Sequence, residues 1–309
     1  MVVPYNAVSF GMIESAPTSK PDNTASVPAD VAARKLAILA AEHVRLADVL
    51  ERQRRSGQLC CRHCGGGRLQ EDGHFSDRGI VQRIWTCQAC GLSQLEHQLS
   101  EDEIAALEDG NLHYQVANED VETRVREHGF ILDLMRPYVA TGAVLDIGCS
   151  RGYKLEAARR TGWRVEGIEL SGASARFAQE VLHLPVHHGT LETYLPPEPF
   201  DAVVAWHVLE HVPSVRAFLD QVNDLLRLGG HAFIQVPSYG LYRQVPDWSA
   251  HLENFCAVHY WYFTAETLTR LAQVSGLEPV FVHDDVPHKH LTVIARKSRE
   301  ALARTPSTS

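Results

Sequence analysis

VLDIGCSRG, which runs from Val144 to Gly152, is the stretch that decides the fold. An apolar run ends at Asp146, a turn with two glycines follows, and the next residues, KLEAARRTG, have a helical pattern. A strand, a tight turn and a helix in this order are the context in which a glycine-rich motif indicates a nucleotide-type ligand. Gly148 and Gly152 would let the backbone pass close to that ligand, beside the free N–H groups that open the helix.

Two acidic residues narrow the choice of ligand. Glu169 closes the run WRVEGIEL, at the separation of about 20 residues where an acid at the end of the next strand binds a ribose diol. Asp146 stands beside the turn, where an acid would repel the phosphates of a dinucleotide and would suit a cationic amine. The pair therefore favours a ligand with an amine and a ribose but no phosphate.

This pattern resembles motif I of the class I S-adenosylmethionine (SAM) methyltransferases, in which an acid is usually followed by GxGxG. The middle glycine is Ser150 here, and Thr190 stands where the family usually carries Asp. The resemblance implies that the turn surrounds the methionine part of SAM, that Glu169 binds the ribose and that Trp206 lies beside the transferable methyl group. The residues that it assigns to the cofactor are Tyr114, Asp146, Gly148, Cys149, Gly152, Glu169, Leu170, Thr190 and Leu191 (at the adenine) and Trp206.

Strands and helices alternate from residue 142 onward, which predicts a parallel, doubly wound α/β sheet. The expected strands are 143–147, 164–169, 185–188, 200–208 and 231–237, followed by a hairpin of 278–284 and 290–296. The methyltransferase resemblance covers roughly residues 110–297. It implies a Rossmann-like sheet of seven strands in the order 3-2-1-4-5-7-6, with the seventh strand antiparallel and SAM at the carboxyl ends of the strands.

Two CxxCG knuckles precede this half of the chain, CRHCGGG with Cys61 and Cys64 and CQACG with Cys87 and Cys90. Four thiolates form the tetrahedral shell that Zn²⁺ prefers, and redox thiols are the alternative. Four cysteine ligands leave no position open for chemistry, so the expected zinc is structural. The region also resembles the N-terminal zinc modules of bacterial methyltransferases from sugar, polysaccharide and natural-product pathways, in which a C..CG-apolar-x-Q stretch leads into an acidic helix.

The chain is expected to divide at composition and motif changes. Ser100 and Glu103 would form a capping box at the start of the acidic helix, and a second helix is expected from about 119 to 138. The predicted segments are a disordered N-terminus (1–27), an amphipathic helix (28–56), the zinc ribbon (57–98), a helical linker (99–141), the methyltransferase domain (142–298) and a disordered tail (299–309).

WHVLEHV, from Trp206 to Val212, resembles the LEHV signature of ubiquinone-biosynthesis-type O-methyltransferases, some of which hold a divalent metal with an ExxEH set. His211 is either a general base for an acceptor hydroxyl or a metal ligand together with His207 and Glu210. A plainer alternative is that Glu210 and His211 cap the following helix. The same letters spell the HxxEH of an inverted zinc protease, but that motif requires a helix and here it begins at the end of a strand.

An aromatic insert follows the fifth expected strand and would wall an acceptor pocket, although packing accounts for part of it. HYWYFTAETLTRLAQVSGLEP resembles a segment of many small-molecule methyltransferases, with Thr264 as helix N-cap. His251 and His259 are further candidates for a base or for orienting the acceptor. The rings of the insert are Tyr239, Tyr242, Trp248, Phe255, Tyr260, Trp261, Tyr262 and Phe263.

The net charge and the distribution of apolar residues limit which functions and locations are expected for the protein. The 309 residues carry a net charge of −9, which disfavours a broad phosphate-binding face. No stretch approaches the roughly 18 apolar residues of a membrane helix, and no signal peptide is evident, so we expect a cytoplasmic protein.

The leading function is SAM-dependent methylation of a small-molecule or glycan acceptor at oxygen. The alternatives are an RNA methyltransferase that uses the ribbon to recognise its substrate, and a non-catalytic SAM-binding scaffold. A homodimer through the N-terminal helix is also possible.

Overall fold

The computed structural model describes residues 59–77, 80–96, 120–196, 198–245 and 258–298, together with Ala33. The predicted N-terminal segment 1–27, the acidic helix with its Ser100–Glu103 capping box, and the tail 299–309 lie outside the described residues, as does nearly all of the predicted helix 28–56. Two candidate site residues, Tyr114 and His251, also lie outside them. Their assignments stay predictions.

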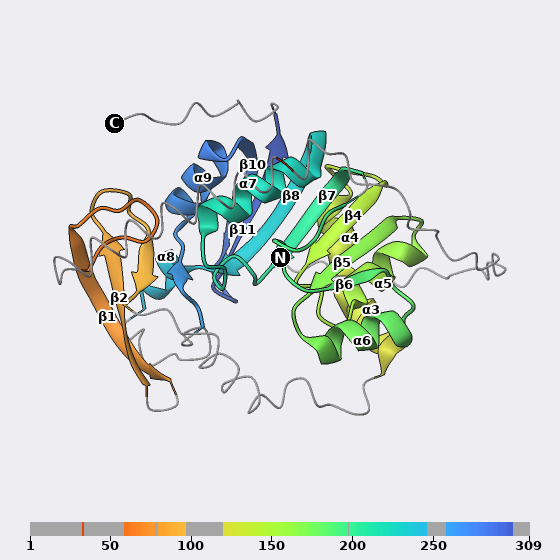
Figure 1. The fold of residues 1–309 in the computed structure, drawn as a ribbon, viewed down its shortest axis with the longest axis horizontal. Coiled ribbons are helices and arrows are strands. Elements are labelled where there is room, and N and C mark those ends of the chain that lie inside the picture. The colour runs from red at the N-terminus through yellow and green to blue at the C-terminus, as the bar shows by residue number, and fades with distance from the viewer. Residues whose placement is uncertain are drawn as a thin grey trace.

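A seven-stranded sheet forms the centre of the larger part of the molecule (Figure 1). Its order from one edge to the other is β6-β5-β4-β7-β8-β11-β10, which is the predicted order 3-2-1-4-5-7-6. Strand β11 pairs antiparallel with both β8 and β10, as expected for the seventh strand. The strands are β4 (Ala143–Ile147), β5 (Arg164–Glu169), β6 (Val186–His188), β7 (Phe200–Trp206), β8 (Leu226–Pro237), β10 (Leu277–Asp285) and β11 (His290–Lys297).

Helices cover both faces of this sheet, because its inner strands are apolar on both sides. Val203 and Ala205 of β7 face one core with Phe218, whereas Ala202 and Val204 face the other. The first core lies under α7 (Val215–Leu225) and α9 (Ala265–Val274), which cross in front of the sheet in Figure 1. The second lies under α3 (Val121–His128), α4 (Phe130–Met135), α5 (Tyr153–Arg160) and α6 (Gly172–Glu180).

Three predicted boundaries are corrected by the structure. The single helix expected over 119–138 is two helices that meet at Gly129, a residue with low helix propensity whose N–H bonds to Arg126 O in a tighter turn. The strand expected over 200–208 ends at Trp206, because His207 has a φ of 55°, outside the extended region. Strand β8 begins at Leu226, earlier than the predicted residue 231.

The cysteine-rich region forms a second, four-stranded sheet in the order β1-β2-β3-β9. Strands β1 (Leu69–Asp77), β2 (Ile80–Cys87) and β3 (Ser93–Leu95) come from this region, whereas β9 (Trp261–Tyr262) belongs to the half of the chain that forms the seven-stranded sheet. In Figure 1 the β1–β2 hairpin lies at one end of the molecule, next to the short helix α8 (Tyr239–Tyr242). The ribbon therefore shares a sheet with the domain that follows it.

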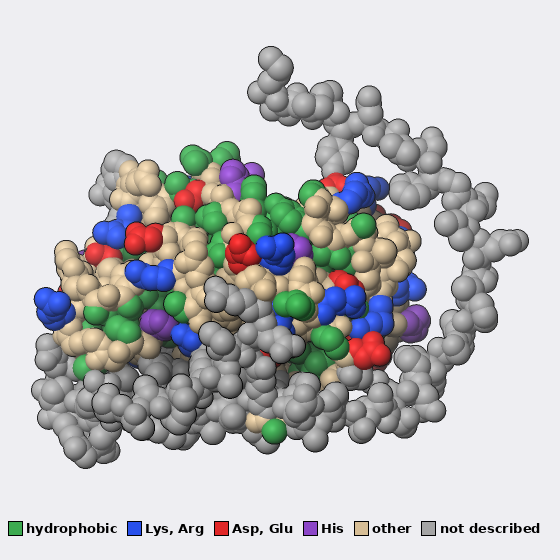
Figure 2. Space-filling view, turned by 90° about the horizontal axis from the view of Figure 1, so that it is seen from above, with side chains coloured by type: hydrophobic (Ala, Val, Ile, Leu, Met, Phe, Trp, Pro, Cys, Tyr) green, Lys and Arg blue, Asp and Glu red, His purple; other side chains and the backbone are tan. Residues whose placement is uncertain are grey.

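One face of the described part of the molecule is mixed in charge. On the face seen in Figure 2, acidic and basic side chains are interspersed with hydrophobic ones. Across the ranges that the structure describes, no helix combines the length and the apolar character that crossing a bilayer requires.

Candidate active site

The turn between β4 and α5 contains three residues in left-handed conformation, Gly148 (φ 70°), Ser150 (φ 51°) and Gly152 (φ 81°). The N–H groups of Gly148 and Cys149 both donate to Ile168 O, at 2.8 and 3.0 Å, which holds the turn against the end of β5. A Cβ atom at Gly148 would lie 2.5 Å from Val208 Cγ2, and one at Gly152 would lie 2.5 Å from Leu184 Cδ1. Both glycines are thus required by the packing of the chain itself.

Ser150 accepts the strained conformation that a glycine would adopt freely, at a cost of about 1–2 kcal/mol. Its N–H donates to Glu169 Oε2 at 2.8 Å, and this bond helps to offset that cost. The substitution of serine at the family's middle glycine position therefore preserves the turn.

Asp146 lies at the end of β4 and is 1% exposed. Its Oδ2 is 3.4 Å from Lys154 Nζ, and neither carboxylate oxygen has a hydrogen-bond partner among the described residues. Burial raises the pKa of this carboxyl to about 6, although the nearby Lys154 charge opposes the rise. A buried carboxylate with unfilled lone pairs fits a ligand that brings a cationic N–H donor, as the amine of SAM would.

Glu169 ends β5 and is 8% exposed. Its Oε2 accepts from Ser150 N, and its Oε1 accepts from Ser171 N at 2.7 Å. The carboxylate therefore braces the turn and the start of α6, a role that sequence analysis did not assign. Each oxygen retains a second lone pair, so a ribose diol fits alongside these bonds.

The remaining residues predicted to bind the cofactor differ in their exposure and in the groups that are available to contact a ligand. The side chains of Cys149 and Leu191 are buried at 3% and 4% exposure, so only their backbone groups suit contact with a ligand. Leu170 is 60% exposed, next to Glu169. Thr190 is tied into its own turn, because its N–H donates to Thr193 Oγ1 at 3.2 Å. Trp206 ends β7 with its ring 5.5 Å from that of Phe130.

Replacing Asp146 by asparagine is expected to weaken SAM binding by roughly 10–150-fold at pH 8, since hydrogen bonds to charged groups contribute about 1.5–3 kcal/mol. Calorimetric titration from pH 5 to pH 8 checks this. Wild-type affinity should rise as the pH passes the pKa of about 6, because protonated Asp146 does not attract a cation. Asp146→Asn should have no such dependence.

The same variant should melt at a higher temperature than wild type at pH 8 when no ligand is present. The raised pKa means that the folded state binds more protons than the unfolded state, so Asp146 makes the protein less stable as the pH rises toward that value. Asp133→Asn, which changes an exposed carboxylate of α4, is the matched control. Equal affinities for wild type and Asp146→Asn would remove Asp146 from the cofactor site.

WHVLEHV does not form a helix in the structure. Residues 209–211 form a turn, and α7 begins at Val215. The protease interpretation is therefore excluded by geometry. The capping interpretation is also wrong, because the N-cap of α7 is Ser214, whose Oγ accepts from Ala217 N at 3.2 Å.

Glu210 is instead the buried centre of a group of histidines. It is 1% exposed, and His207 Nδ1 lies 3.2 Å from its Oε1, while its Oε2 has no hydrogen-bond partner among the described residues. Burial alone would raise the pKa of Glu210, but the bond from His207 and the neighbouring rings of His211 and His259 lower it below its ordinary value. The carboxylate is therefore ionised and can stabilise positive charge on these rings.

His211 and His259 lie face to edge, with ring centroids 4.6 Å apart. His211 Nδ1 is 3.0 Å from Val258 O. A carbonyl oxygen can only accept, so Nδ1 carries the hydrogen and Nε2 of the neutral ring carries the lone pair. This arrangement suits a base. The ligand atoms of Glu210, His211 and His259 lie within 4.8 Å of one another, a donor set that also fits a divalent cation. His207 is not in this set.

The aromatic insert contributes mainly to packing. The described rings are all buried, so they do not wall an open pocket, and Trp248 and Phe255 lie outside the described residues. Thr264 is the N-cap of α9 as predicted, with Thr267 completing a capping box. The buried rings are Tyr239, Tyr242, Tyr260, Trp261, Tyr262 and Phe263.

The four cysteines of the two knuckles come together as predicted. The Sγ atoms of Cys61 and Cys90 are 3.7 Å apart, and those of Cys64 and Cys87 are 3.6 Å apart. A tetrahedral zinc with Zn–S bonds of about 2.3 Å places its sulfurs roughly 3.8 Å from one another, so the cluster fits this ion. The hydrogen bond from Cys61 lowers the pKa of Cys90 to about 5, which favours a thiolate in the cluster.

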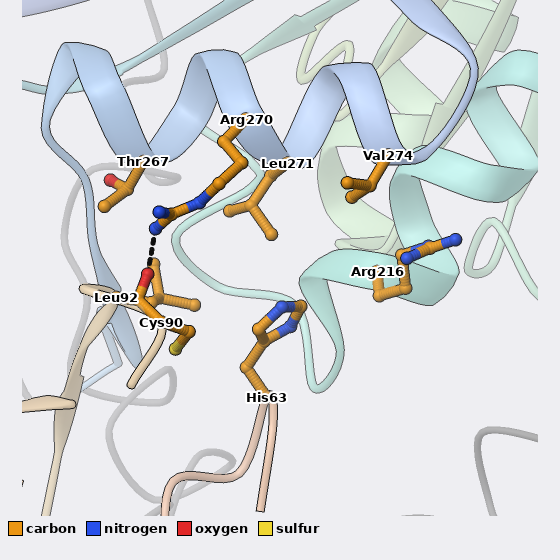
Figure 3. A pocket seen from close by; sticks show the side chains of 8 residues that line it. All are labelled: His63, Cys90, Leu92, Arg216, Thr267, Arg270, Leu271 and Val274. Carbon is orange, nitrogen blue, oxygen red and sulfur yellow. Dashed lines mark hydrogen bonds between the residues drawn. The ribbon is translucent and has the colours of Figure 1, made fainter. Parts of the chain in front are cut away.

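The second knuckle is fixed through α9 to the half of the chain that forms the seven-stranded sheet. The guanidinium of Arg270 donates to Cys90 O, as Figure 3 shows. A cavity of about 220 Å³ lies at this joint, and His63 points toward it from the first knuckle. The other residues that line it are Cys90, Leu92, Arg216, Thr267, Arg270, Leu271 and Val274.

Three ribbon residues that sequence analysis did not select hold the first knuckle in place (Gln94) or join the ribbon to the half with the seven-stranded sheet (Asp72 and Arg62). Gln94 is fully buried and bonds to Cys60 O and Arg62 N, on either side of Cys61. Asp72 accepts from Tyr239 OH at 3.3 Å and lies 3.6 Å from the guanidinium of Arg243. Gln94 is the Q of the C..CG-apolar-x-Q pattern, so a signal existed for it. Nothing in the sequence singles out Asp72 or Arg62.

Known proteins resemble the catalytic half. The “Methyltransferase domain” family model matches residues 119–282. The ubiquinone biosynthesis O-methyltransferase of Rhodopseudomonas palustris (strain HaA2) is 39% identical over 92 residues, which are 28% of this chain and 36% of the relative. That of Paramagnetospirillum magneticum (strain ATCC 700264 / AMB-1) is 38% identical over 102 residues, 31% of this chain and 41% of the relative. The chain thus spans less than half the length of these relatives.

Among solved structures, the Burkholderia thailandensis 1,6-didemethyltoxoflavin-N1-methyltransferase, with 1,6-didemethyltoxoflavin and S-adenosylhomocysteine bound, is 22% identical. The match covers 73% of this chain and 99% of that one, with a TM-score of 0.48. The family model extends over more than half of the 309 residues and contains the β4 turn, Glu169 and the Glu210 group. The chain therefore belongs to the methyltransferase-domain family.

Proposed function

We propose that the protein transfers the methyl group of SAM to a hydroxyl group of a small-molecule or glycan acceptor. The observation that carries the proposal is the tautomer of His211, whose Nδ1 donates to Val258 O and whose ring lies near the buried, ionised Glu210 after the carboxyl end of β7. Bound SAM would supply an electrophilic methyl group. The curated relatives are named as O-methyltransferases, which supports oxygen as the methylated atom.

In this proposal, the residues of the β4 turn bind and orient the cofactor. Asp146 holds its amine and Glu169 its ribose, while Gly148, Gly152 and the neighbouring backbone shape the crevice. Trp206 and Leu170 would border it, and the backbone at Thr190 and Leu191 would contact the adenine. Holding the acceptor in line with the methyl group supplies a large part of the rate in a displacement of this kind.

The histidine group prepares the acceptor. His211 Nε2 accepts the hydroxyl proton, and the resulting positive ring is stabilised by the carboxylate of Glu210. His259, whose ring lies 4.6 Å from that of His211, orients the acceptor oxygen. A divalent cation held by Glu210, His211 and His259 is the alternative, in which the ion would lower the pKa of the acceptor hydroxyl. In that case a chelator abolishes turnover.

The four cysteines would hold a structural zinc, since no ligand position remains open in a Cys₄ site.

Formation of S-adenosylhomocysteine in the presence of candidate acceptors tests the function. Phenols, catechols and sugar nucleotides should each be offered with SAM labelled in its methyl group, and an unmodified structured RNA should serve as a further arm. The proposal expects label in a hydroxylated small molecule. Label in the RNA, or SAM binding without turnover on any acceptor, would replace it with the RNA methyltransferase or the scaffold.

Replacing Glu169 by alanine is expected to weaken SAM binding by about 1.5–3 kcal/mol, roughly 10–150-fold, because the ribose loses a charged acceptor. Calorimetric titration measures this directly, and NAD should give no heat. Glu169→Gln keeps the size of the side chain and can no longer accept at both positions, so it should lie between alanine and wild type. An unchanged affinity in the alanine variant would limit Glu169 to bracing Ser150 and Ser171.

A further inference from the structure

Arg62, next to the metal-cluster residue Cys61, is buried at 5% exposure. Its Nη2 donates to Tyr260 O at 3.4 Å, and its guanidinium lies 5.3 Å from the centroid of the Trp261 ring. Within the described ranges, no carboxylate forms an ion pair with it. Burying the charge of an arginine without a carboxylate partner costs free energy of folding. The contacts of Arg62 therefore have to offset this cost.

The backbone that Arg62 contacts carries His259. Tyr260 O also accepts from Leu95 N at 3.1 Å, and Gln94 pairs with Trp261 in the ladder between β3 and β9. The ribbon therefore holds this short segment by main-chain bonds as well as by the arginine. His259 is the residue immediately before these contacts.

The other side of the same segment contacts the turn that contains Glu210 and His211. Trp261 Nε1 donates to Val212 O at 2.7 Å, and Trp261 N donates to Glu210 O at 3.3 Å. His211 Nδ1 donates to Val258 O, which fixes the tautomer of the proposed base. A shift of the segment would therefore move His259 and weaken the bond that orients His211.

We propose that Arg62 is a positioning residue, which couples the cysteine cluster to the Val258–Tyr262 segment and thereby holds His259 and His211 in place for the acceptor step. This inference rests on the proposed function for the role of the two histidines. Four thiolates around a divalent cation leave a net negative charge. Arg62 follows Cys61 directly and supplies the opposite charge next to the cluster, while its Nη2 donates to Tyr260 O.

Cofactor binding and the acceptor step depend on different parts of the protein. Cofactor binding uses the β4 turn and Glu169, which share no described contact with Arg62. The acceptor step uses His211 and His259. Loss of Arg62 should therefore lower kcat and leave SAM affinity unchanged, whereas a general loss of stability would affect both.

The test compares Arg62→Met with Arg68→Met. Methionine keeps most of the buried volume of Arg62 but removes its charge and its donors, and Arg68 is an exposed arginine of the same ribbon. Arg62→Met should retain one zinc per chain and wild-type SAM affinity, lose about 10–100-fold in kcat, and lose amide-exchange protection at Leu95 and Trp261. Arg68→Met should match wild type in all four measurements.

Arg62→Lys keeps the charge on a shorter side chain, so its kcat and its exchange protection should lie between those of wild type and Arg62→Met. If the methionine variant does not fold, the lysine variant provides the comparison with wild type. Unchanged exchange protection at Leu95 and Trp261 in Arg62→Met, or lost protection with full kcat, would overturn the inference. A wild-type protein that binds SAM but methylates no acceptor would overturn the proposed function instead. In that case amide exchange still tests whether Arg62 holds the Val258–Tyr262 segment, since this measurement requires no turnover.

Discussion

Turnover of His211→Ala is expected to fall by about 10²–10⁴-fold while SAM affinity stays the same, because a general base contributes this much and acts on the acceptor. His211 Nδ1 is already used by Val258 O, so the alanine variant removes both the base and its anchor. Steady-state kinetics with an established acceptor, together with calorimetry for SAM, measure the two effects separately.

His211→Asn is the matched control for structure. Its side-chain amide can still donate toward Val258 O, but it has no basic nitrogen. If His211 is the base, asparagine should restore the melting temperature without restoring the rate. A variant that loses stability and keeps its kcat would contradict the role.

Chelation distinguishes the base from the metal alternative. A base requires no ion, so a chelator that leaves the cysteine cluster loaded should not affect turnover. Loss of turnover that added Mg²⁺ or Mn²⁺ restores would assign Glu210, His211 and His259 to a cation site.

Cys87→Ser is expected to release the zinc and unfold the ribbon, since binding of a structural zinc contributes an apparent 10–16 kcal/mol in small zinc domains. Cys87 is fully buried, with its Sγ 3.6 Å from that of Cys64. Metal analysis should find one zinc per wild-type chain and none in the variant. The seven-stranded sheet should persist, as judged by circular dichroism and retained SAM binding, because none of the four cysteines is a buried member of its two cores and only Cys90 of the four packs against them.

Cys60→Ser is the control for this experiment. Cys60 is also buried but lies outside the cluster, so its variant should retain the metal. Pure wild-type protein with intact thiols and no zinc would remove the ribbon assignment. Retention of metal by Cys87→Ser would remove Cys87 from the ligand set.

The sequence predicted the sheet of the catalytic half well, because the signals that define it are local. The central strands β4 and β7 are short apolar runs, and the turn after β4 carries its glycines and Asp146 in a fixed pattern. The order of the strands came from the methyltransferase resemblance and was confirmed by the pairing. The helix boundary at Gly129 was missed, because one glycine only weakens a helix and neighbouring contacts decide where it ends.

The candidate active site was predicted only in part. Asp146 and Glu169 were found from their spacing, but the bonds from Ser150 and Ser171 to Glu169 depend on the tertiary fold. The contact of His211 with His259 joins residues 48 positions apart, which no local pattern reveals. The rings of the insert were expected near the acceptor, yet burial placed the described ones in the cores.

The pairing of β3 with β9 has a consequence for how the chain reaches its native state. The first three strands of the ribbon leave the ribosome long before Trp261 and Tyr262 are synthesised, so the outer side of β3 stays an open edge during that interval. Open edges invite pairing with other chains. Metal binding by the newly made knuckles would fold the β1–β2 hairpin earlier. The edge of β3 nevertheless stays unpaired until β9 has been synthesised and pairs with it. An isolated ribbon fragment should accordingly aggregate more readily than the same residues in the full chain.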